Sequence, residues 1–139
     1  MDHAATVRGM FDSINAGDVD DFGDHLAEDF VEHEVTPTQD QTKEGTKQLF
    51  RMMMTAFPDL RFDTEDVLSI DYKVVARTRA TGTNTGPFMG MPPTGKSVNI
   101  QLIDILRFAD DGLVHEHWGV MDMMSMMQQL GLAPEGPPA

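Results

Sequence analysis

The stretch that most constrains this chain is residues 104–122, where two strand-like runs flank the sequence Asp110-Asp111-Gly112. An Asp-Gly turn between runs rich in Ile, Leu and Val is typical of a β-hairpin. Such a hairpin lets Asp104 on the first strand approach Glu116 and Trp118 on the second. Because the hairpin also carries a dense set of ionisable side chains, we expect the chain to perform acid–base chemistry.

Helical periodicity dominates the first half of the chain. Helices are predicted over residues 5–16, 18–26 and 46–57, with a short strand over residues 30–35. Gly17 and Pro58 end the first and third helices. Apolar residues spaced three and four apart give each of these two helices one buried face. Phe11 belongs to the first face, and Phe50 and Met53 belong to the second.

The second half of the chain is predicted to form strands separated by turns. The strands span residues 60–69, 73–83, 97–108 and 113–121, and a Met-rich helix begins at Asp122. Helices followed by long antiparallel strands predict an α+β fold, in which N-terminal helices cover one face of a curved sheet and enclose a pocket. The Gly- and Pro-rich segment 82–95 is expected to flank the mouth of that pocket.

Length and composition limit the number of domains and the classes of partner. The 139 residues, 40% of them hydrophobic, suit one domain over residues 1–133 and a flexible tail over residues 134–139. A formal net charge of -13 repels phosphates and anionic lipid, so neither nucleic acid nor a membrane is expected as a partner. Without cysteines, a signal-peptide pattern or a bilayer-spanning apolar run, the expected location is the cytoplasm.

Residues 90–97 match the phosphate-loop pattern G-x-x-x-x-G-K-S letter for letter. Such a loop donates successive backbone N–H groups and opens a helix, whereas Pro92 and Pro93 donate none and a strand is predicted to follow. We therefore expect no nucleotide site there.

The sequence His115-Glu116-His117 places two imidazoles on one face of a strand, where they could ligate a metal together with Asp122 or His33. The other elements of a metal-binding jelly roll are missing from the sequence. A surface or interface pair of histidines is the favoured interpretation, and no metal is expected.

The opposite face of the same strand carries Glu116 and Trp118, with Asp122 in phase. On the preceding strand Asp104 shares a face with Leu106, and a buried aspartate is costly unless it has a partner or a task. Carboxylates in an apolar pocket have raised pKa values and can transfer protons near neutral pH. The alternatives are that Asp122 caps the last helix and that Glu116 pairs with an arginine.

The other face of that preceding strand, with Ile103 and Ile105, is also apolar. This predicts that a second subunit covers the outside of the sheet. The 12 methionines are either core residues or the adaptable wall of a site for a flat hydrophobic ligand.

Short motifs are spread along nearly the whole chain. They are Asn15-Ala-Gly-Asp18, Ala27-Glu-Asp-Phe-Val-Glu-His33, Gly45, Phe57-Pro-Asp-Leu60, Gly82-Thr with Gly86, residues 90–96, Arg107-Phe108, Asp111-Gly112, Glu116-His-Trp118, Asp122 and Gln129-Leu-Gly131. In this order they resemble the SnoaL-like polyketide cyclases of the nuclear-transport-factor-2-like superfamily.

The resemblance implies a cone-shaped α+β fold with a strongly bent sheet, in a homodimer formed through the sheets. It also implies ring closure by intramolecular aldol condensation without metal or organic cofactor, with an aspartate as general acid and base. That aspartate falls near Asp122, an assisting histidine falls near Asp104, and His33 is placed in the pocket; without the resemblance, His33 is equally an ordinary strand residue.

We therefore predict a small enzyme that takes an apolar, carbonyl-bearing substrate into the cone. The catalytic candidates are Asp122, Asp104 and His33. The candidates for substrate contact are Glu116, Trp118, His117, Phe11, Phe50, Met53 and Leu106. The alternative is a small-molecule-binding module that keeps the pocket without the chemistry.

Overall fold

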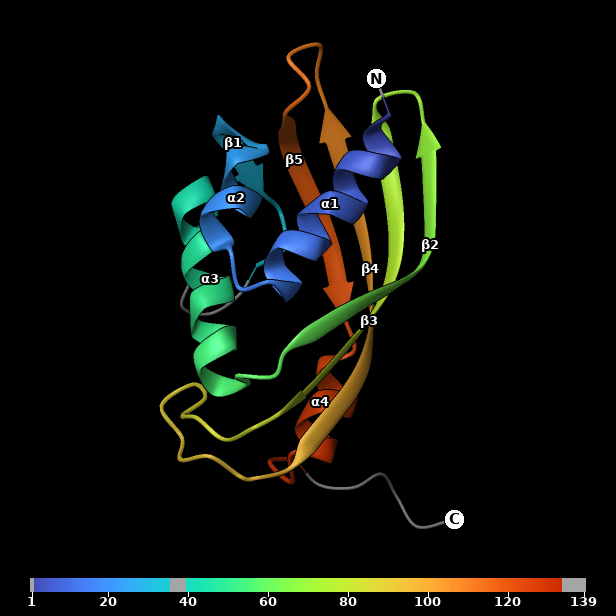
Figure 1. Cartoon of the computed structure of the whole chain (residues 1–139). Coiled ribbons are helices and arrows are strands. Elements are labelled where there is room, and N and C mark those ends of the chain that lie inside the picture. Colours follow the sequence, from blue (N-terminus) through green and yellow to red (C-terminus); the bar gives the residue numbers. More distant parts are fainter. Residues whose placement is uncertain (1, 36–39, 134–139) are drawn as a thin grey trace.

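The computed structural model describes residues 2–35 and 40–133, which form four helices and one five-stranded sheet (Figure 1). In chain order the elements are α1 (His3–Asn15), α2 (Val19–Asp24), β1 (Leu26–Glu32), α3 (Lys43–Ala56), β2 (Arg61–Ile70), β3 (Lys73–Thr83), β4 (Ser97–Phe108), β5 (Val114–Met121) and α4 (Met123–Gln129). As predicted, the first half of the chain is mainly helical and the second half consists mainly of strands. The predicted tail over residues 134–139 lies outside the described residues.

Each described helix begins behind a side-chain cap that accepts a backbone N–H three residues ahead. The caps are Asp2 for α1, Asp18 for α2, Thr42 for α3 and Asp122 for α4. A cap of this kind stabilises a helix by about 1 kcal/mol, because it satisfies a donor that has no partner within the helix. Gly17, with a φ of +78°, follows the first helix as predicted.

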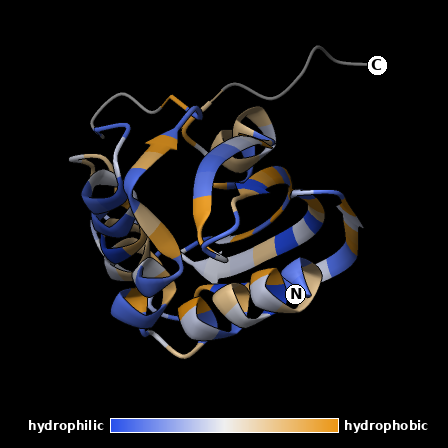
Figure 2. Ribbon diagram, turned by 90° about the horizontal axis from the view of Figure 1, so that it is seen from above, coloured by the Kyte–Doolittle hydropathy of each residue, from blue (hydrophilic) through white to orange (hydrophobic). Residues whose placement is uncertain are grey.

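The strand order in the sheet is β1-β5-β4-β3-β2. Strand β1 runs parallel to β5, and the other neighbours are antiparallel. The sheet curves, with α1, α2 and α3 on its inner side and α4 near one end of β4 and β5 (Figures 1 and 2). The predicted α+β class, with a curved mixed sheet covered by the N-terminal helices, is confirmed.

The core lies between the inner face of the sheet and the helices. Val7, Met10 and Ile14 from α1 pack in the same cluster as Val74 of β3 and Phe108 of β4. Hydrophilic and hydrophobic segments alternate along the strands (Figure 2), as expected where one face is buried. Full burial of a side chain such as Ile14 stabilises the fold by roughly 1.5–3 kcal/mol.

A β-bulge interrupts the predicted hairpin of β4 and β5. Next to the turn, Phe108 pairs with Val114. One residue farther from the turn on β4, Arg107 pairs with Glu116 and not with His115. His115 is therefore an extra residue on β5. Because side chains alternate between the two faces of a strand, one extra residue moves every later side chain to the opposite face.

The bulge decides which side chains of β5 face inward. Cross-strand partners point to the same face, and Asp104 pairs with Gly119. Asp104 therefore shares its face with His117, two residues before Gly119. The predicted placement of Glu116 and Trp118 on this face is wrong, because the prediction assumed a regular strand.

Two further predictions concern the ends and connections of the elements. Ser97 begins β4, so residues 90–97 do not open a helix and lack the context of a phosphate loop. Strand β1 begins four residues earlier than predicted, because Leu26 already pairs with Val114. Within residues 2–35 and 40–133, no helix combines the length and the apolar character needed to cross a bilayer.

Candidate active site

A cavity of about 100 Å³ lies between the inner face of the sheet and helices α1 to α3. Its wall is mainly apolar and includes Phe11 from α1, Phe50 and Met53 from α3, and Leu106 from β4. Its ionisable wall residues are Glu32, Glu34, Asp104 and His117, which we call the acid–base cluster. An apolar cavity with a few convergent polar groups is the usual form of a small-molecule site.

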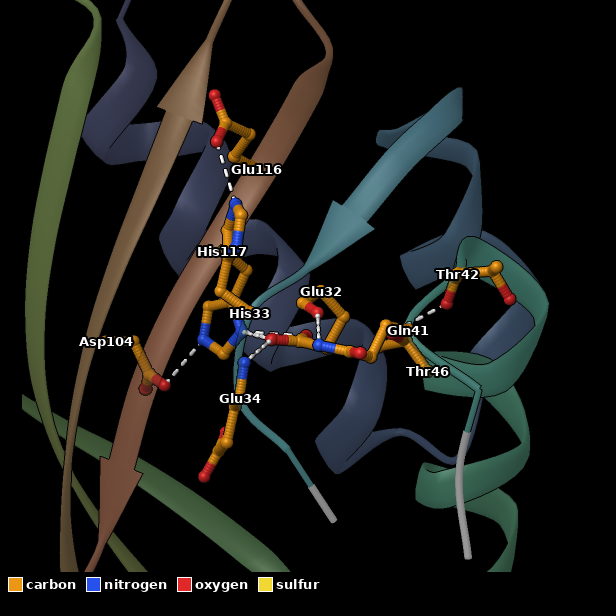
Figure 3. A network of polar contacts seen from close by, with 9 residues as sticks. All are labelled: Glu32, His33, Glu34, Gln41, Thr42, Thr46, Asp104, Glu116 and His117. Carbon is orange, nitrogen blue, oxygen red and sulfur yellow. Dashed lines mark hydrogen bonds and ion pairs between the residues drawn. The ribbon is translucent and has the colours of Figure 1, made fainter.

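His117 lies between two carboxylates from neighbouring strands (Figure 3). Its Nε2 is 2.8 Å from Asp104 Oδ1, and its Nδ1 is 2.6 Å and 2.8 Å from the two carboxylate oxygens of Glu32. Only 15% of the His117 side chain, 11% of Asp104 and 6% of Glu32 are exposed. Three largely buried ionisable groups thus form one hydrogen-bonded row across β4, β5 and β1.

The two carboxylates determine the charge of His117. Burial by itself lowers the pKa of His117, because it penalises the charged ring. The hydrogen bonds and negative charges of Asp104 and Glu32 outweigh burial and raise the pKa to about 10. At neutral pH His117 is therefore an imidazolium ion whose two N–H groups donate to the two carboxylates.

Glu34 follows β1 and brings a third carboxyl group to the cavity. Its backbone N–H donates to Glu32 Oε1 at 2.9 Å, and the N–H of His33 donates to the His117 carbonyl oxygen at 2.9 Å. Burial is the main cause that raises the pKa of the Glu34 carboxyl. The negative charges of Asp104 and Glu32 add to it, and the opposing charge of His117 does not cancel the rise.

Gly119 provides the space in which these groups meet. A Cβ atom at this position would lie 2.8 Å from Glu34 Oε2, 2.8 Å from Asp104 Oδ1 and 2.7 Å from His117 Cε1. Real Cβ contacts are longer, so any side chain here would force the cluster to move. The cluster therefore depends on a glycine at the β5 position that pairs with Asp104.

Glu32, Glu34 and His117 offer potential ligand atoms within 4.8 Å of one another. To bind a cation, however, His117 would have to lose a proton held with a pKa of about 10 and exchange one carboxylate partner for the ion. A cation at this point would therefore compete with the proton of His117 and with its carboxylate partners. The predicted pairing of His115 with His117 does not form, because His115 lies at the bulge and its Nε2 is 2.8 Å from Asp111.

Six predicted site residues belong to the wall of the cavity. They are Asp104, His117, Phe11, Phe50, Met53 and Leu106. Asp104 and Leu106 stand at inward positions of a regular strand and the other apolar residues on the faces of α1 and α3, whereas the bulge in β5 turns His117 inward. Contact with a substrate stays a prediction for all six.

Three other predicted residues lie on the outer face of the sheet, which corrects their assignment to the pocket. His33 stacks on Trp118 with ring centroids 4.8 Å apart, and its Nε2 is 2.8 Å from Glu116 Oε2. Arg107 also contacts Glu116, at 2.5 Å. These two hydrogen bonds hold the pKa of the Glu116 carboxyl below its usual range, and the bond from His33 has the larger effect. The alternative in which Glu116 pairs with an arginine is the one observed.

Asp122, the first catalytic candidate, is an exposed helix cap. Its Oδ1 accepts the backbone N–H of Ser125 at 3.1 Å, and its side chain does not belong to the cavity wall. Of the two roles considered for Asp122, the structure shows capping. The catalytic role is not supported, because the exposed Asp122 side chain lies outside the cavity wall.

Glu32 and Glu34 are site residues that the sequence prediction missed. A signal for Glu32 was present, since it stands two residues after Phe30 in a strand and therefore shares the buried face of Phe30. Glu34 lies beyond the strand, where alternation no longer applies. Its position depends on the hydrogen bond to Glu32 and could not be predicted from spacing.

Comparison with known proteins gives a consistent set of likenesses. The sequence matches the family model described as SnoaL-like polyketide cyclase over residues 4–130. It is 27% identical over 132 residues to the aklanonic acid methyl ester cyclase AcmA of Streptomyces galilaeus, covering 91% of this chain and 89% of that protein. Among solved structures, AclR of Streptomyces galilaeus, a proposed hydroxylase, has a TM-score of 0.84 at 30% identity and covers 97% of this chain and 88% of its own. IdmH of Streptomyces antibioticus, a proposed polyketide cyclase, has a TM-score of 0.81 at 28% identity and covers 94% of this chain and 99% of its own.

Proposed function

The chain belongs to the SnoaL-like polyketide cyclase family, and from this premise we propose that it catalyses cofactor-independent acid–base chemistry on a hydrophobic carbonyl substrate. The reaction is an intramolecular aldol condensation or a related isomerisation within the cavity. The observation that carries the proposal is the buried row Asp104–His117–Glu32 at the polar part of an otherwise apolar wall.

Asp104 is the proposed base. One of its oxygens accepts a hydrogen bond from His117, which leaves the other for a substrate C–H group. When the carboxylate takes a proton from the carbon next to a carbonyl, the C–H electron pair moves into an enolate. The enolate carbon then attacks a second carbonyl carbon of the same molecule, and the new alkoxide oxygen takes up a proton.

His117 has an electrostatic role in this proposal. Its positive charge lies within the cavity wall, where it favours the negative charge that develops on the enolate and alkoxide oxygens. Glu32 holds the ring from its other nitrogen and thereby fixes its orientation. The proton transfer assigned to Asp104 is general acid–base catalysis, which typically contributes about 10²–10⁴-fold to a rate.

The size and lining of the cavity are relevant to the substrate. The volume of about 100 Å³ is below the roughly 300–1,000 Å³ of common ligand pockets. A fused-ring substrate therefore requires side chains of the wall to move. Met10, Met53 and Met121 in the wall suit this, because unbranched thioether side chains adapt readily.

The experiment uses aklanonic acid methyl ester, the substrate in the name of the relative AcmA, as the probe ester. The proposed ring-closing step is the addition step of the condensation and ends at the alcohol, so it conserves all atoms. The expected product therefore has the mass of the probe ester and a different chromatographic retention. No turnover of this and related aromatic polyketide esters, together with an unmodified hydrophobic ligand seen by native mass spectrometry, would instead support the binding-module alternative.

We also propose that the protein is a homodimer formed through the outer face of the sheet. Leu68, Val75, Ile105 and Trp118 are successive cross-strand partners and make an apolar row on this face. Leu68 is 58% exposed, so the row lies open in the single chain. In sedimentation velocity, Leu68→Lys is expected to shift a dimer toward monomer, whereas Gln48→Lys on α3 leaves it intact. A monomeric wild-type protein would contradict this proposal.

A further inference from the structure

We propose that Glu34 is the acid of this site: it carries a proton in the free protein and donates it to the oxygen of the substrate. This inference rests on the proposed function and divides it between two carboxyl groups, with Asp104 as base and Glu34 as acid. The contacts of the acid–base cluster carry it.

The first argument is the distribution of hydrogen-bond donors. His117 supplies the two N–H groups of its imidazolium ring, and these go to Asp104 and Glu32. Among the described residues, no side chain or backbone group donates to the carboxyl oxygens of Glu34. Because this carboxyl is partly buried and receives no donor from the described residues, its charged form is disfavoured relative to the neutral acid.

The second argument is the surrounding charge. The titratable groups that face Glu34 are Glu32 on β1, Asp104 on β4 and His117 on β5. The wall residues contributed by α1 and α3 carry no charge. One imidazolium and three carboxylates would leave two negative charges in a small apolar cavity. A proton on Glu34 halves this excess, in agreement with the raised pKa of its carboxyl.

The third argument is the position of Glu34 relative to the base. Glu34 Oε2 and Asp104 Oδ1 both approach the same point above Gly119, each 2.8 Å from the place where a Cβ would be. The two carboxyl groups therefore face a common point, and one water molecule between them would relay a proton from one to the other. The hydrogen bond from the Glu34 backbone to Glu32 keeps Glu34 beside the row.

These positions complete a balanced proton cycle. Asp104 takes the proton from the substrate carbon, and the new C–C bond converts the second carbonyl into an alkoxide. The O–H bond of Glu34 breaks as its proton moves to the alkoxide, which leaves Glu34 as a carboxylate. The proton on Asp104 then passes to Glu34 and restores the starting state, so that no proton is consumed and nothing is oxidised or reduced.

The test combines an infrared titration of the free protein with turnover of the probe ester. Wild-type protein is expected to show a carboxylic acid C=O band that persists above pH 4.5, the ordinary pKa of a glutamate. Glu34→Gln should lack this band. Glu28→Gln, which changes a 94% exposed glutamate of β1, should keep it. In turnover, Glu34→Gln should lower kcat by at least about 100-fold with little change in KM, and Glu34→Asp should restore part of the rate.

Two results would overturn the inference. One is a spectrum in which Glu34→Gln removes no carboxylic acid band at any pH above 4.5. The other is a Glu34→Gln protein that turns over the probe ester at the wild-type rate. If wild-type protein shows the band and turns over no ester, the proposed function fails, while the protonation of Glu34, measured without substrate, still stands.

Discussion

Replacing Asp104 by asparagine should lower the pKa of His117. The substitution keeps the size of the side chain but removes its negative charge and the acceptor at 2.8 Å from Nε2. Asp104 is the foremost of the causes that raise the pKa of His117 to about 10, ahead of Glu32. Loss of one opposite charge at this distance typically shifts a pKa by about 1–3 units, so we expect a value of roughly 7–9 in the variant.

The same shift gives a stability difference with a definite sign. The pKa of His117 is raised on folding, from 6.5 to about 10. The resulting stability is fully present below pH 6.5 and is lost as the pH rises through about 10. At about 1.4 kcal/mol per pKa unit, the loss in wild-type protein is on the order of 5 kcal/mol. In Asp104→Asn the loss over this window should be smaller by about 1–4 kcal/mol.

Two assays check this prediction. Nitrogen-15 NMR of labelled histidine follows the ring of His117 directly, and urea unfolding at several pH values between 6.5 and 10 gives the free energy of unfolding. Asp63→Asn is the control, because it removes a surface carboxylate that pairs with Arg61. A His117 that titrates near 6.5 in wild-type protein, or equally in wild type and Asp104→Asn, would refute the reasoning.

Three further predictions concern single positions and the ligand. Gly119→Ala places a Cβ 2.7–2.8 Å from three members of the acid–base cluster. We therefore expect about 1–3 kcal/mol of destabilisation and loss of turnover. A variant with the unfolding temperature and kcat of the wild-type protein would contradict the close approach. Asp122→Ala should lose about 0.5–2 kcal/mol of stability as a helix cap but keep its kcat, and a catalytic defect at wild-type stability would return Asp122 to the site. The free acid of the probe ester should bind at least about 10-fold more weakly than the ester in calorimetry, because its carboxylate faces the negative cluster; equal affinity would show that the two do not meet.

The architecture could be predicted from the sequence because it depends on local patterns. Helix caps, stop signals and strand alternation lie within a few residues of one another, and Asp18, Gly17 and Pro58 mark their boundaries correctly. The apolar wall followed from the same patterns, since Phe11 and Phe50 stand on the buried faces of regular helices.

The polar half of the site could not be predicted in the same way, because it depends on one extra residue. His115 makes a bulge in β5, and this single irregularity exchanges the inner and outer faces for His117 and Trp118. Periodicity cannot reveal a bulge in advance. Glu34 was missed for a related reason, since a hydrogen bond rather than a strand position holds it.

The central claim is that the chemistry belongs to the inner acid–base cluster and not to the outer face of the same hairpin. Its most direct test is turnover of the probe ester by Asp104→Asn and by Glu116→Gln, two variants that each replace one carboxylate by its amide. We predict that Asp104→Asn loses at least about 100-fold in kcat and that Glu116→Gln retains the wild-type rate. An active Asp104→Asn beside an inactive, folded Glu116→Gln would contradict the claim.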